Sequence, residues 1–142
     1  MRSIKILSLV SLLFFIGCDE RQADLPVCGK FAFVSSDQFD NAINRGDFFI
    51  QSARIEDDCL LMSVRIGTCD INDTEVELVD SGSVTNSGEH HRTLRLLLDT
   101  DDSCNVDEIV TLSFDLRPLR ITEAQEVILN IQTFGEAITY TY

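Results

Sequence analysis

Two acidic stretches contain the side chains best suited to chemistry, because clustered carboxylates bind hard cations. The stretch "CDINDTE" supplies Asp70 and Asp73, and "DTDDSC" supplies Asp99, Asp101 and Asp102. Ca²⁺ takes roughly six to eight oxygen ligands from such loops, but the spacing here does not match the EF-hand loop and lacks its glycine. Two interpretations stay open: a Ca²⁺ site, and two solvated acidic loops on a very acidic protein. We expect no other cofactor.

The sequence lacks the motifs that indicate catalysis. His90 and His91 are its only histidines, and neighbouring side chains of an extended chain point to opposite sides, which makes them a poor chelating pair. There is no nucleophile elbow, no His-Glu-x-x-His and no glycine-rich phosphate loop. With 24 acidic residues, pairs of carboxylates arise by number alone, so they do not indicate glycoside hydrolysis. We therefore expect a protein that is not an enzyme.

The N-terminal residues are typical of an export signal that ends at a lipid-modified cysteine. Two basic residues precede an apolar stretch over 6–16, which is shorter than the roughly 20 residues of a membrane-spanning helix and matches the central region of a secretory signal. Gly17-Cys18 then resembles the lipobox of bacterial lipoproteins, in which the chain is cut before a cysteine that receives the lipid. Phe15 departs from the aliphatic residue of that pattern, so a signal peptide cut elsewhere stays the alternative.

This interpretation divides the chain into a signal peptide over 1–17, a lipid-bearing cysteine and tether over 18–27, and one domain over 28–142. Residues 19–27 show no apolar periodicity, and nine extended residues reach at most about 30 Å. The domain would therefore stay close to a membrane to which the lipid anchors it. We expect a location in the bacterial cell envelope, with the outer membrane favoured over the inner membrane and the leaflet left open.

The charge of the chain favours basic partners and disfavours nucleic acid. The sequence has 24 acidic and 11 basic residues and a net charge of −13, and removing residues 1–17 takes away Arg2 and Lys5 and leaves −15. Phosphate binding needs clustered Lys and Arg, whereas a strong negative field steers cationic proteins toward a surface. We expect membrane contact through the lipid, no nucleic acid, and a cationic protein as the candidate partner. The oligomeric state is left open.

From residue 48 onward, apolar and polar residues alternate, as in half-buried β-strands with one wet face. Turn residues separate the strands at short spacing, which is typical of an antiparallel sandwich or barrel. The prediction is an all-β fold: a single antiparallel β-sandwich, or partly open barrel, of about seven to eight strands. The expected strands are 30–34, 47–55, 59–67, 74–80, 92–99, 109–116, 127–133 and 137–142.

The segments between these strands carry weaker signals. Glu56-Asp57-Asp58 predicts a tight hairpin, and 81–91 predicts a polar loop rich in Gly, Ser and Asn. One helical turn capped by Ser36 or Asp37 is expected after the first strand. In the last strands the alternation assigns Asp115, like Thr111, to the wet face.

Consecutive apolar residues break the alternation at Phe48-Phe49 and at 96–98. One residue of each set must leave the core face of its sheet. Packing against a neighbouring loop or sheet is one interpretation, and a small exposed apolar contact surface is the other.

The remaining four cysteines predict two disulfides, because an exported chain with an even number and no Cys-x-x-Cys favours pairing over a metal site. Cys59 and Cys69 flank one strand, whose ten residues separate their Cα atoms by about 33 Å, whereas a disulfide needs about 7 Å or less. If successive strands run up and down, the loops that hold Cys69 and Cys104 lie at the same end. This predicts Cys69–Cys104 and leaves Cys28–Cys59.

Three stretches carry a resemblance to known proteins: "GDFFIQSARIEDDCLLMSVRIGTCD", "VELVDSGSV" and "LSFDLRPL". They resemble small lipoproteins of Bacteroidetes-type bacteria, with a link to the NigD-like lipoproteins, over about residues 28–142. The resemblance implies a β-sandwich and an envelope location, and it brings no site residues because that group is of unknown function. We predict a lipid-anchored, non-enzymatic binding or accessory module. The alternative is an inhibitor or immunity-type protein that binds a cationic toxin or a lysozyme-like enzyme.

Overall fold

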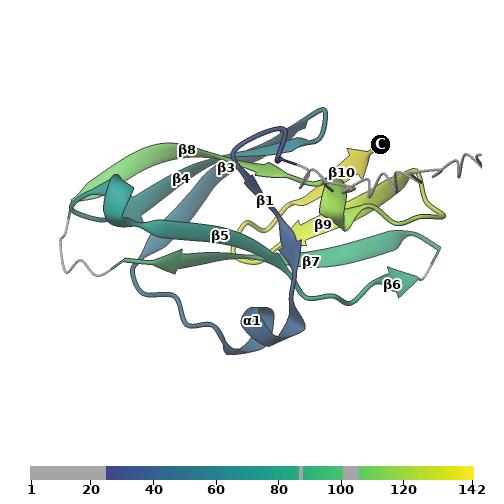
Figure 1. Cartoon of the computed structure of the whole chain (residues 1–142), viewed down its shortest axis with the longest axis horizontal. Coiled ribbons are helices and arrows are strands. Elements are labelled where there is room, and N and C mark those ends of the chain that lie inside the picture. The colour runs from purple at the N-terminus through teal and green to yellow at the C-terminus, as the bar shows by residue number, and fades with distance from the viewer. Residues whose placement is uncertain (1–24, 87, 101–105) are drawn as a thin grey trace, which may run out of the picture.

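The alternating residues build two β-sheets that face each other in a computed structural model describing residues 25–86, 88–100 and 106–142 (Figure 1). This confirms the predicted all-β sandwich. The four-stranded sheet has the spatial order β1 (Lys30–Phe31), β8 (Asp107–Asp115), β4 (Cys59–Gly67) and β3 (Phe48–Glu56). The six-stranded sheet has the order β10 (Ala137–Thr141), β9 (Glu126–Ile131), β7 (His90–Asp99), β5 (Glu75–Asp80) and β2 (Phe33–Val34), and β6 (Thr85–Asn86) pairs with β7.

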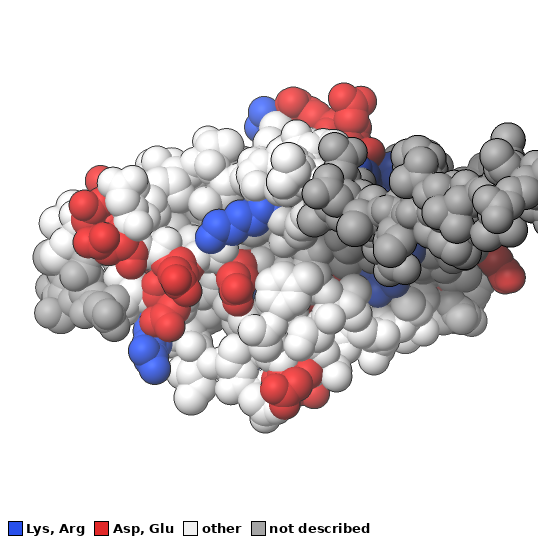
Figure 2. Space-filling model, in the orientation of Figure 1, with Lys and Arg blue, Asp and Glu red and all other residues white. Residues whose placement is uncertain are grey.

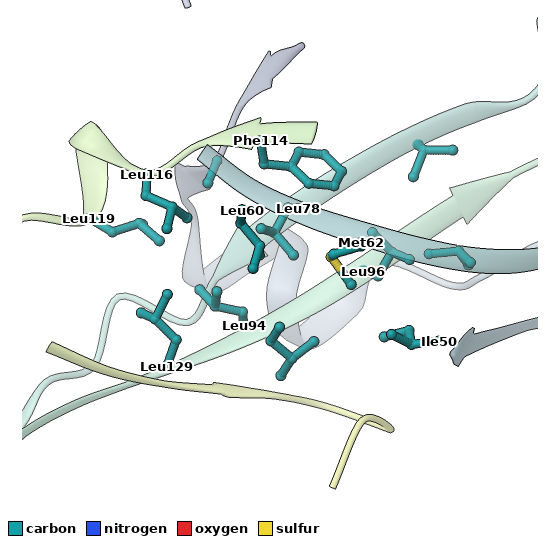
Figure 3. Packing of buried hydrophobic residues seen from close by; sticks show 14 of the residues in the cluster. Ile50, Leu60, Met62, Leu78, Leu94, Leu96, Phe114, Leu116, Leu119 and Leu129 are labelled. Carbon is teal, nitrogen blue, oxygen red and sulfur yellow. The ribbon is translucent and has the colours of Figure 1, made fainter. Parts of the chain in front are cut away.

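The core lies between the inward faces of the two sheets (Figure 3). Successive side chains of a strand point to opposite faces, so every second residue of β4 and β7 is buried. Burying one such apolar side chain stabilises the fold by about 1.5–3 kcal/mol. The buried side chains of the two strands together favour packing of the sheets face to face. The buried apolar residues on the core face of these two strands are Leu60, Met62, Val64, Ile66, Leu94, Leu96 and Leu98.

Most strand pairs are antiparallel, as predicted, but β1–β8, β2–β5 and β7–β9 are parallel. The reason is that the chain changes sheets between successive strands. It leaves β7 for β8 in the opposite sheet and then crosses back through the 3₁₀ helix η2 (Arg117–Leu119), so β9 starts at the end of the sandwich where β7 started. Parallel neighbours need such a crossover, whereas a short hairpin gives antiparallel ones. Seven strands of the described chain exceed two residues, in line with the expected number.

The short elements follow the sequence closely. Helix α1 (Ser36–Asn41) forms where one turn was expected, but its N-cap is Ser35, whose Oγ accepts a hydrogen bond from Gln38 N at 3.3 Å. The hairpin is confirmed: Glu56 pairs with Cys59, and Asp57 has φ 54°, which Asp tolerates better than most residues. The expected loop over 81–91 contains β6, which pairs with the start of β7. No helix within the described ranges is long and apolar enough to span a bilayer.

The sandwich has two chemically different ends. At one end lie residues 25–28, 56–58 and 116–125, and we name it the paired end because Asp58 and Asp115 bond to arginines there. At the other end β4 and β7 finish while β5 and β8 begin. We name that end, made of described residues 67–75, 99–100 and 106–108, the acidic end.

Candidate functional site

The acidic end brings together the two loops that the sequence singled out. Thr68 N donates a hydrogen bond to Val106 O at 2.9 Å, and Glu75 pairs with Asp99 across β5 and β7. Asp70 and Asp73 therefore lie at the same end as Asp99. The expectation that these loops share one end is confirmed for the residues that flank them.

The described carboxylates of this end do not form a cage for a cation. Asp70 Oδ1 accepts hydrogen bonds from Asn72 N at 2.9 Å and Asn72 Nδ2 at 2.8 Å, and so caps the 3₁₀ helix η1 (Ile71–Asp73). Asp99 lies 3.5 Å from Arg45 Nη1. Among the residues that the structure describes, no group of three or more His, Cys, Asp or Glu side chains could hold a metal ion. The other predicted ligands, Asp101 and Asp102, lie outside those residues, so the Ca²⁺ site stays a prediction.

The predicted disulfide between Cys28 and Cys59 is present, with a Cα–Cα distance of 6.0 Å. It ties the start of the described chain to the β3–β4 hairpin at the paired end. Beside it, Gly29 has φ +43°, and a Cβ there would overlap the carbonyl oxygen of Ser113, so only glycine fits this approach. Cys104 lies outside the described residues, and the Cys69–Cys104 disulfide stays a prediction.

The burial of Asp115 differs from the prediction made from the sequence. The alternation placed it on the wet face of its strand, but the structure buries it completely. Its carboxylate accepts hydrogen bonds from Val27 N at 2.9 Å, Arg117 N at 3.0 Å and Arg117 Nη2 at 2.7 Å. Arg117 Nη2 also donates to Leu25 O at 2.8 Å. Residues 25–27 cover the carboxylate, so a long-range contact overrides the alternation.

Burial alone would raise the pKa of the Asp115 carboxyl. The hydrogen bonds from Arg117 and from Val27 N outweigh burial and hold that pKa below its usual value. Asp115 is therefore ionised, and it anchors the start of the described chain at the paired end.

A second carboxylate, Asp58, is held at the paired end by a tyrosine and an arginine. Tyr140 Oη donates to Asp58 Oδ1 at 2.6 Å, and Arg120 Nη2 donates to the same oxygen at 2.5 Å. The bond from Tyr140, followed by Arg120, lowers the pKa of Asp58. Burial and the hydrogen bond to Asp58 raise the pKa of Tyr140 to about 12. A phenol with that pKa is a structural donor and a poor general base at neutral pH.

The third pair, Asp80 with Arg92, lies inside the sandwich. Arg92 Nη1 donates to Asp80 Oδ1 at 2.8 Å, and Gly82 N donates to the same oxygen at 2.7 Å. Asp80 Oδ2 and Arg92 Nε are buried without a hydrogen-bond partner among the described residues. Burial raises the pKa of Asp80 despite Gly82 and Arg92. The sequence held a signal for this pair, because both residues share the core face of their strands.

A cavity of about 570 Å³ opens at the paired end. Arg92 and Arg120 line it, together with His90 and Glu123. Each guanidinium is already bonded to a carboxylate, and Glu123 adds negative charge, so the lining offers no surplus positive charge to an anionic ligand. We assign this cavity no ligand.

A smaller cleft of about 260 Å³ lies toward the acidic end, between β5 and β8. Apolar side chains dominate its walls: Ile71, Val76, Leu112 and Phe114. Lys30 also lines the cleft, and its Nζ donates to Val76 O at 3.0 Å. On the face shown in Figure 2, carboxylates gather toward the left, where Figure 1 places the start of β5, beside a largely uncharged strip.

The cleft exists because the sandwich is open along one side. β1 pairs with only the last two residues of β8, Phe114 and Asp115, and β2 pairs with only the last two residues of β5. Among the described residues, β8 from Asp107 to Leu112 has a partner strand on one side alone, which is β4. The apolar cleft and the unpaired edge of β8 therefore lie side by side.

The two runs of consecutive apolar residues have different outcomes. Leu97 leaves the core face but is buried, lining a small surface hollow with Ala42 and Ile43 that follow α1. Phe49 remains 59% exposed. It lies in the same cross-strand row as Arg65 and Ile109, which is 63% exposed. The outer face of the four-stranded sheet thus carries two separate apolar side chains.

Crystal structures of three proteins share this fold. A protein of unknown function, DUF1344, from Bacteroides vulgatus has a TM-score of 0.53 and 18% identity, covering 80% of this chain and 55% of its own. A NigD-like immunity protein from Bacteroides caccae has a TM-score of 0.58 and 14% identity, covering 78% and 58%. A putative toxin-related protein from Parabacteroides distasonis has a TM-score of 0.51 and 16% identity, covering 79% and 60%.

These likenesses establish the fold alone, since the identities are low. The chain spans somewhat over half the length of each of these proteins. They agree with the resemblance to NigD-like proteins of Bacteroidetes-type bacteria seen in the sequence. No family model matches this sequence, and no curated protein matches it.

Proposed function

We propose that this chain is a lipid-anchored, non-enzymatic binding module of the bacterial cell envelope that presents its acidic end to a cationic protein. One observation carries the proposal: the described chain starts at the paired end, and four exposed carboxylates without a described ion-pair partner lie together at the opposite end, on Asp73, Glu75, Asp107 and Glu108. Residues 25–28 are fixed there by Asp115, Arg117 and the Cys28–Cys59 disulfide.

The lipid anchor orients the two ends of the sandwich relative to the membrane. With the lipid on Cys18, a tether of at most about 30 Å joins the membrane to the paired end. The acidic end then faces away from the bilayer, where anionic headgroups do not compete with it. A negative surface in that position raises the encounter rate with basic proteins.

The fold supports the more specific alternative of an inhibitor or immunity-type protein. The Bacteroides caccae protein of similar fold is described as a NigD-like immunity protein. Immunity proteins and inhibitors both need tight binding to one particular toxin or enzyme. A rigid sandwich with a charged end suits such binding. A lysozyme-like enzyme is the candidate partner because such enzymes are basic.

The anchor is tested by the intact mass of the full chain produced in a bacterial host. We expect a mass that begins at Cys18 and includes acyl chains. The Cys18→Ala variant lacks the acceptor for the lipid, so its mass should show no acyl chains. A wild-type chain cut elsewhere and free of lipid contradicts the anchor.

The partner class is tested with egg-white lysozyme as the basic probe. The charge-reversed variant Asp73→Lys/Glu75→Lys/Asp107→Lys changes the acidic end, and Asp57→Lys/Glu123→Lys/Glu126→Lys makes the same change of charge at the paired end. All six residues are exposed. At low salt we expect the first variant to slow association about tenfold and the second about twofold. Equal slowing by both variants, or no binding of wild type in 10 mM salt, contradicts the proposal.

A further inference from the structure

We propose that the open edge of β8 at the acidic end binds an extended, lysine- or arginine-containing segment of the partner as an additional β-strand. This inference rests on the proposed function and specifies how the cationic partner is held. Strand addition uses main-chain hydrogen bonds for affinity and side-chain pockets for selectivity. The open edge supplies the hydrogen-bonding groups, and the cleft and the surrounding carboxylates supply the selectivity.

The direction of the backbone groups on β8 follows from its last residues. Asp115 O accepts a hydrogen bond from Ala32 N at 3.0 Å, so Asp115 faces away from β4. Leu116 N donates to Asp58 O at 2.9 Å, so the next residue faces the β3–β4 side. In an antiparallel pair this direction alternates along the strand. Asp107, Ile109 and Thr111 therefore present N–H and C=O groups at the open edge.

The length of this edge suits a short strand. From Asp107 to Thr111 it spans five residues, which is an ordinary strand length of about five to six. Beyond it, Gly29 lies against the Ser113 carbonyl and β1 occupies the edge at Phe114 and Asp115. An added strand would thus lie end to end with β1 along the same edge.

Side chains of the added strand alternate between two surroundings. Those that point inward meet the apolar cleft between β8 and β5, whose walls include Ile71, Val76 and Leu112. Those that point outward lie beside Ile109 and Thr111 on the solvent face. A segment with alternating apolar and polar residues matches this edge.

The charge around the edge selects a basic segment. Asp107 and Glu108 begin β8, and Asp73 and Glu75 flank the cleft from the other sheet. All four are exposed, and no described cation forms an ion pair with them. Lys30 is the cation that lines the cleft, at its far side from the acidic end. Lysine or arginine at an end of the segment therefore meets unneutralised carboxylates.

The test uses the peptide Ac-KVKVKVK-amide as the probe and Ac-EVEVEVE-amide as its charge-reversed control. The lysine peptide has the same charge pattern in either strand direction, so it does not presuppose parallel or antiparallel pairing. The full chain in detergent is titrated with each peptide and binding is followed by NMR. We expect the lysine peptide to bind at least tenfold more tightly than the glutamate peptide. We also expect slower amide exchange at Ile109 and Thr111.

Thr111→Pro is the decisive variant, because it removes the N–H at the centre of the edge while proline is tolerated on edge strands. Thr139→Pro is the matched control: Thr139 is exposed on β10, the edge strand of the six-stranded sheet on the other side of the sandwich. We expect Thr111→Pro to weaken binding at least tenfold and Thr139→Pro to leave it unchanged.

The remaining outcomes separate this inference from the proposed function. If Asp107→Lys/Glu108→Lys abolishes binding while Thr111→Pro leaves it intact, strand addition is wrong and the cationic partner survives. If both peptides bind equally, or the lysine peptide fails to bind at 1 mM, the inference is overturned. If Thr111→Pro does not fold, the amide exchange of the wild-type chain decides, since unchanged exchange at Ile109 and Thr111 overturns it.

Discussion

The two ends of the sandwich treat their acidic residues in opposite ways. At the paired end Asp58 and Asp115 lie against arginine, and Asp115 is completely buried. At the acidic end Asp73 and Asp107 are exposed and form no ion pair with a described residue. Asp58 and Asp115 thus serve structure, whereas Asp73 and Asp107 contribute to the electrostatic field of the surface.

The difference follows from the energetics of burying charge. A carboxylate taken out of water needs a cation and hydrogen bonds, and removing its partner destabilises the fold strongly. An exposed carboxylate stays hydrated and adds little to stability. Substitutions of the carboxylates bonded to arginine should therefore change stability, and substitutions at the acidic end should leave it almost unchanged.

Removing the Cys28–Cys59 disulfide should have the largest effect. The double variant Cys28→Ser/Cys59→Ser opens a loop that spans 31 residues of sequence separation. Chain entropy in the unfolded state then predicts a loss of about 3–4 kcal/mol in the free energy of unfolding. Urea unfolding measures it, and a loss below about 1 kcal/mol would show that the bridge does not brace the paired end.

Asp115→Ala should destabilise the fold by about 3 kcal/mol, because it leaves Arg117 and two backbone N–H groups without their acceptor. The matched substitution at the acidic end, Asp107→Ala, should change the free energy of unfolding by about 0.5 kcal/mol or less. Thermal and urea unfolding of both variants give the comparison. Similar losses for the two would remove the distinction between the ends.

Tyr140→Phe should cost about 1.5 kcal/mol, since it deletes a buried hydrogen bond to a charged acceptor, Asp58. The pKa of Asp58 should rise toward its usual value, because Tyr140 is the main cause of its depression. Urea unfolding measures the stability, and NMR titration of the carboxyl measures the pKa. A Tyr140→Phe chain with the wild-type Asp58 pKa would contradict this role.

Acidification should destabilise the protein through the paired end. The pKa values of Asp58 and Asp115 lie below the ordinary 3.8 in the folded state, so their contribution is complete above about pH 5. It is lost as the pH falls through the folded values. Asp80 acts in the opposite sense, because its pKa is raised.

Unfolding free energies at pH 5, 4 and 3 check this dependence. Between pH 5 and pH 3, Asp115→Asn should lose less stability than wild type, by about 1 kcal/mol. Asp73→Asn at the acidic end should follow the wild-type curve. An Asp115→Asn curve that is parallel to wild type would show that Asp115 does not couple folding to protons.

Neutralising the acidic end should have the smallest effect on stability. The variant Asp73→Asn/Glu75→Gln/Asp107→Asn/Glu108→Gln should be stabilised by about 0.5 kcal/mol at low ionic strength, because like charges repel less. The gain should vanish in about 0.5 M salt, where screening removes the repulsion. Thermal unfolding at the two salt concentrations measures it, and a clear destabilisation would mean that these carboxylates hold structure after all.

Much of the fold could be predicted from alternation alone, because each strand with one buried face repeats every two residues. Leu60, Met62 and Val64 were assigned correctly for that reason. The Cys28–Cys59 disulfide was predicted correctly as the pair that remained after strand length had excluded Cys59–Cys69 and strand direction had favoured Cys69–Cys104. Asp115 was assigned to the wrong face, since residues 25–27 that cover it are far away in sequence. The parallel pairing of β7 with β9 was missed because a crossover between sheets leaves no local signal.

The order of the residues alone establishes the charge of the molecule, the periodicity of its strands and the spacing of its cysteines, because these are local properties of the chain. The tertiary structure decided which carboxylates are buried against arginine and which remain exposed, because that depends on contacts between distant segments. It also decided that, among the described residues, β8 from Asp107 to Leu112 has no partner strand on the side of the apolar cleft. The short β1 and β2 pair only at one end of their neighbours, and no residue pattern within β8 records how far its partner extends.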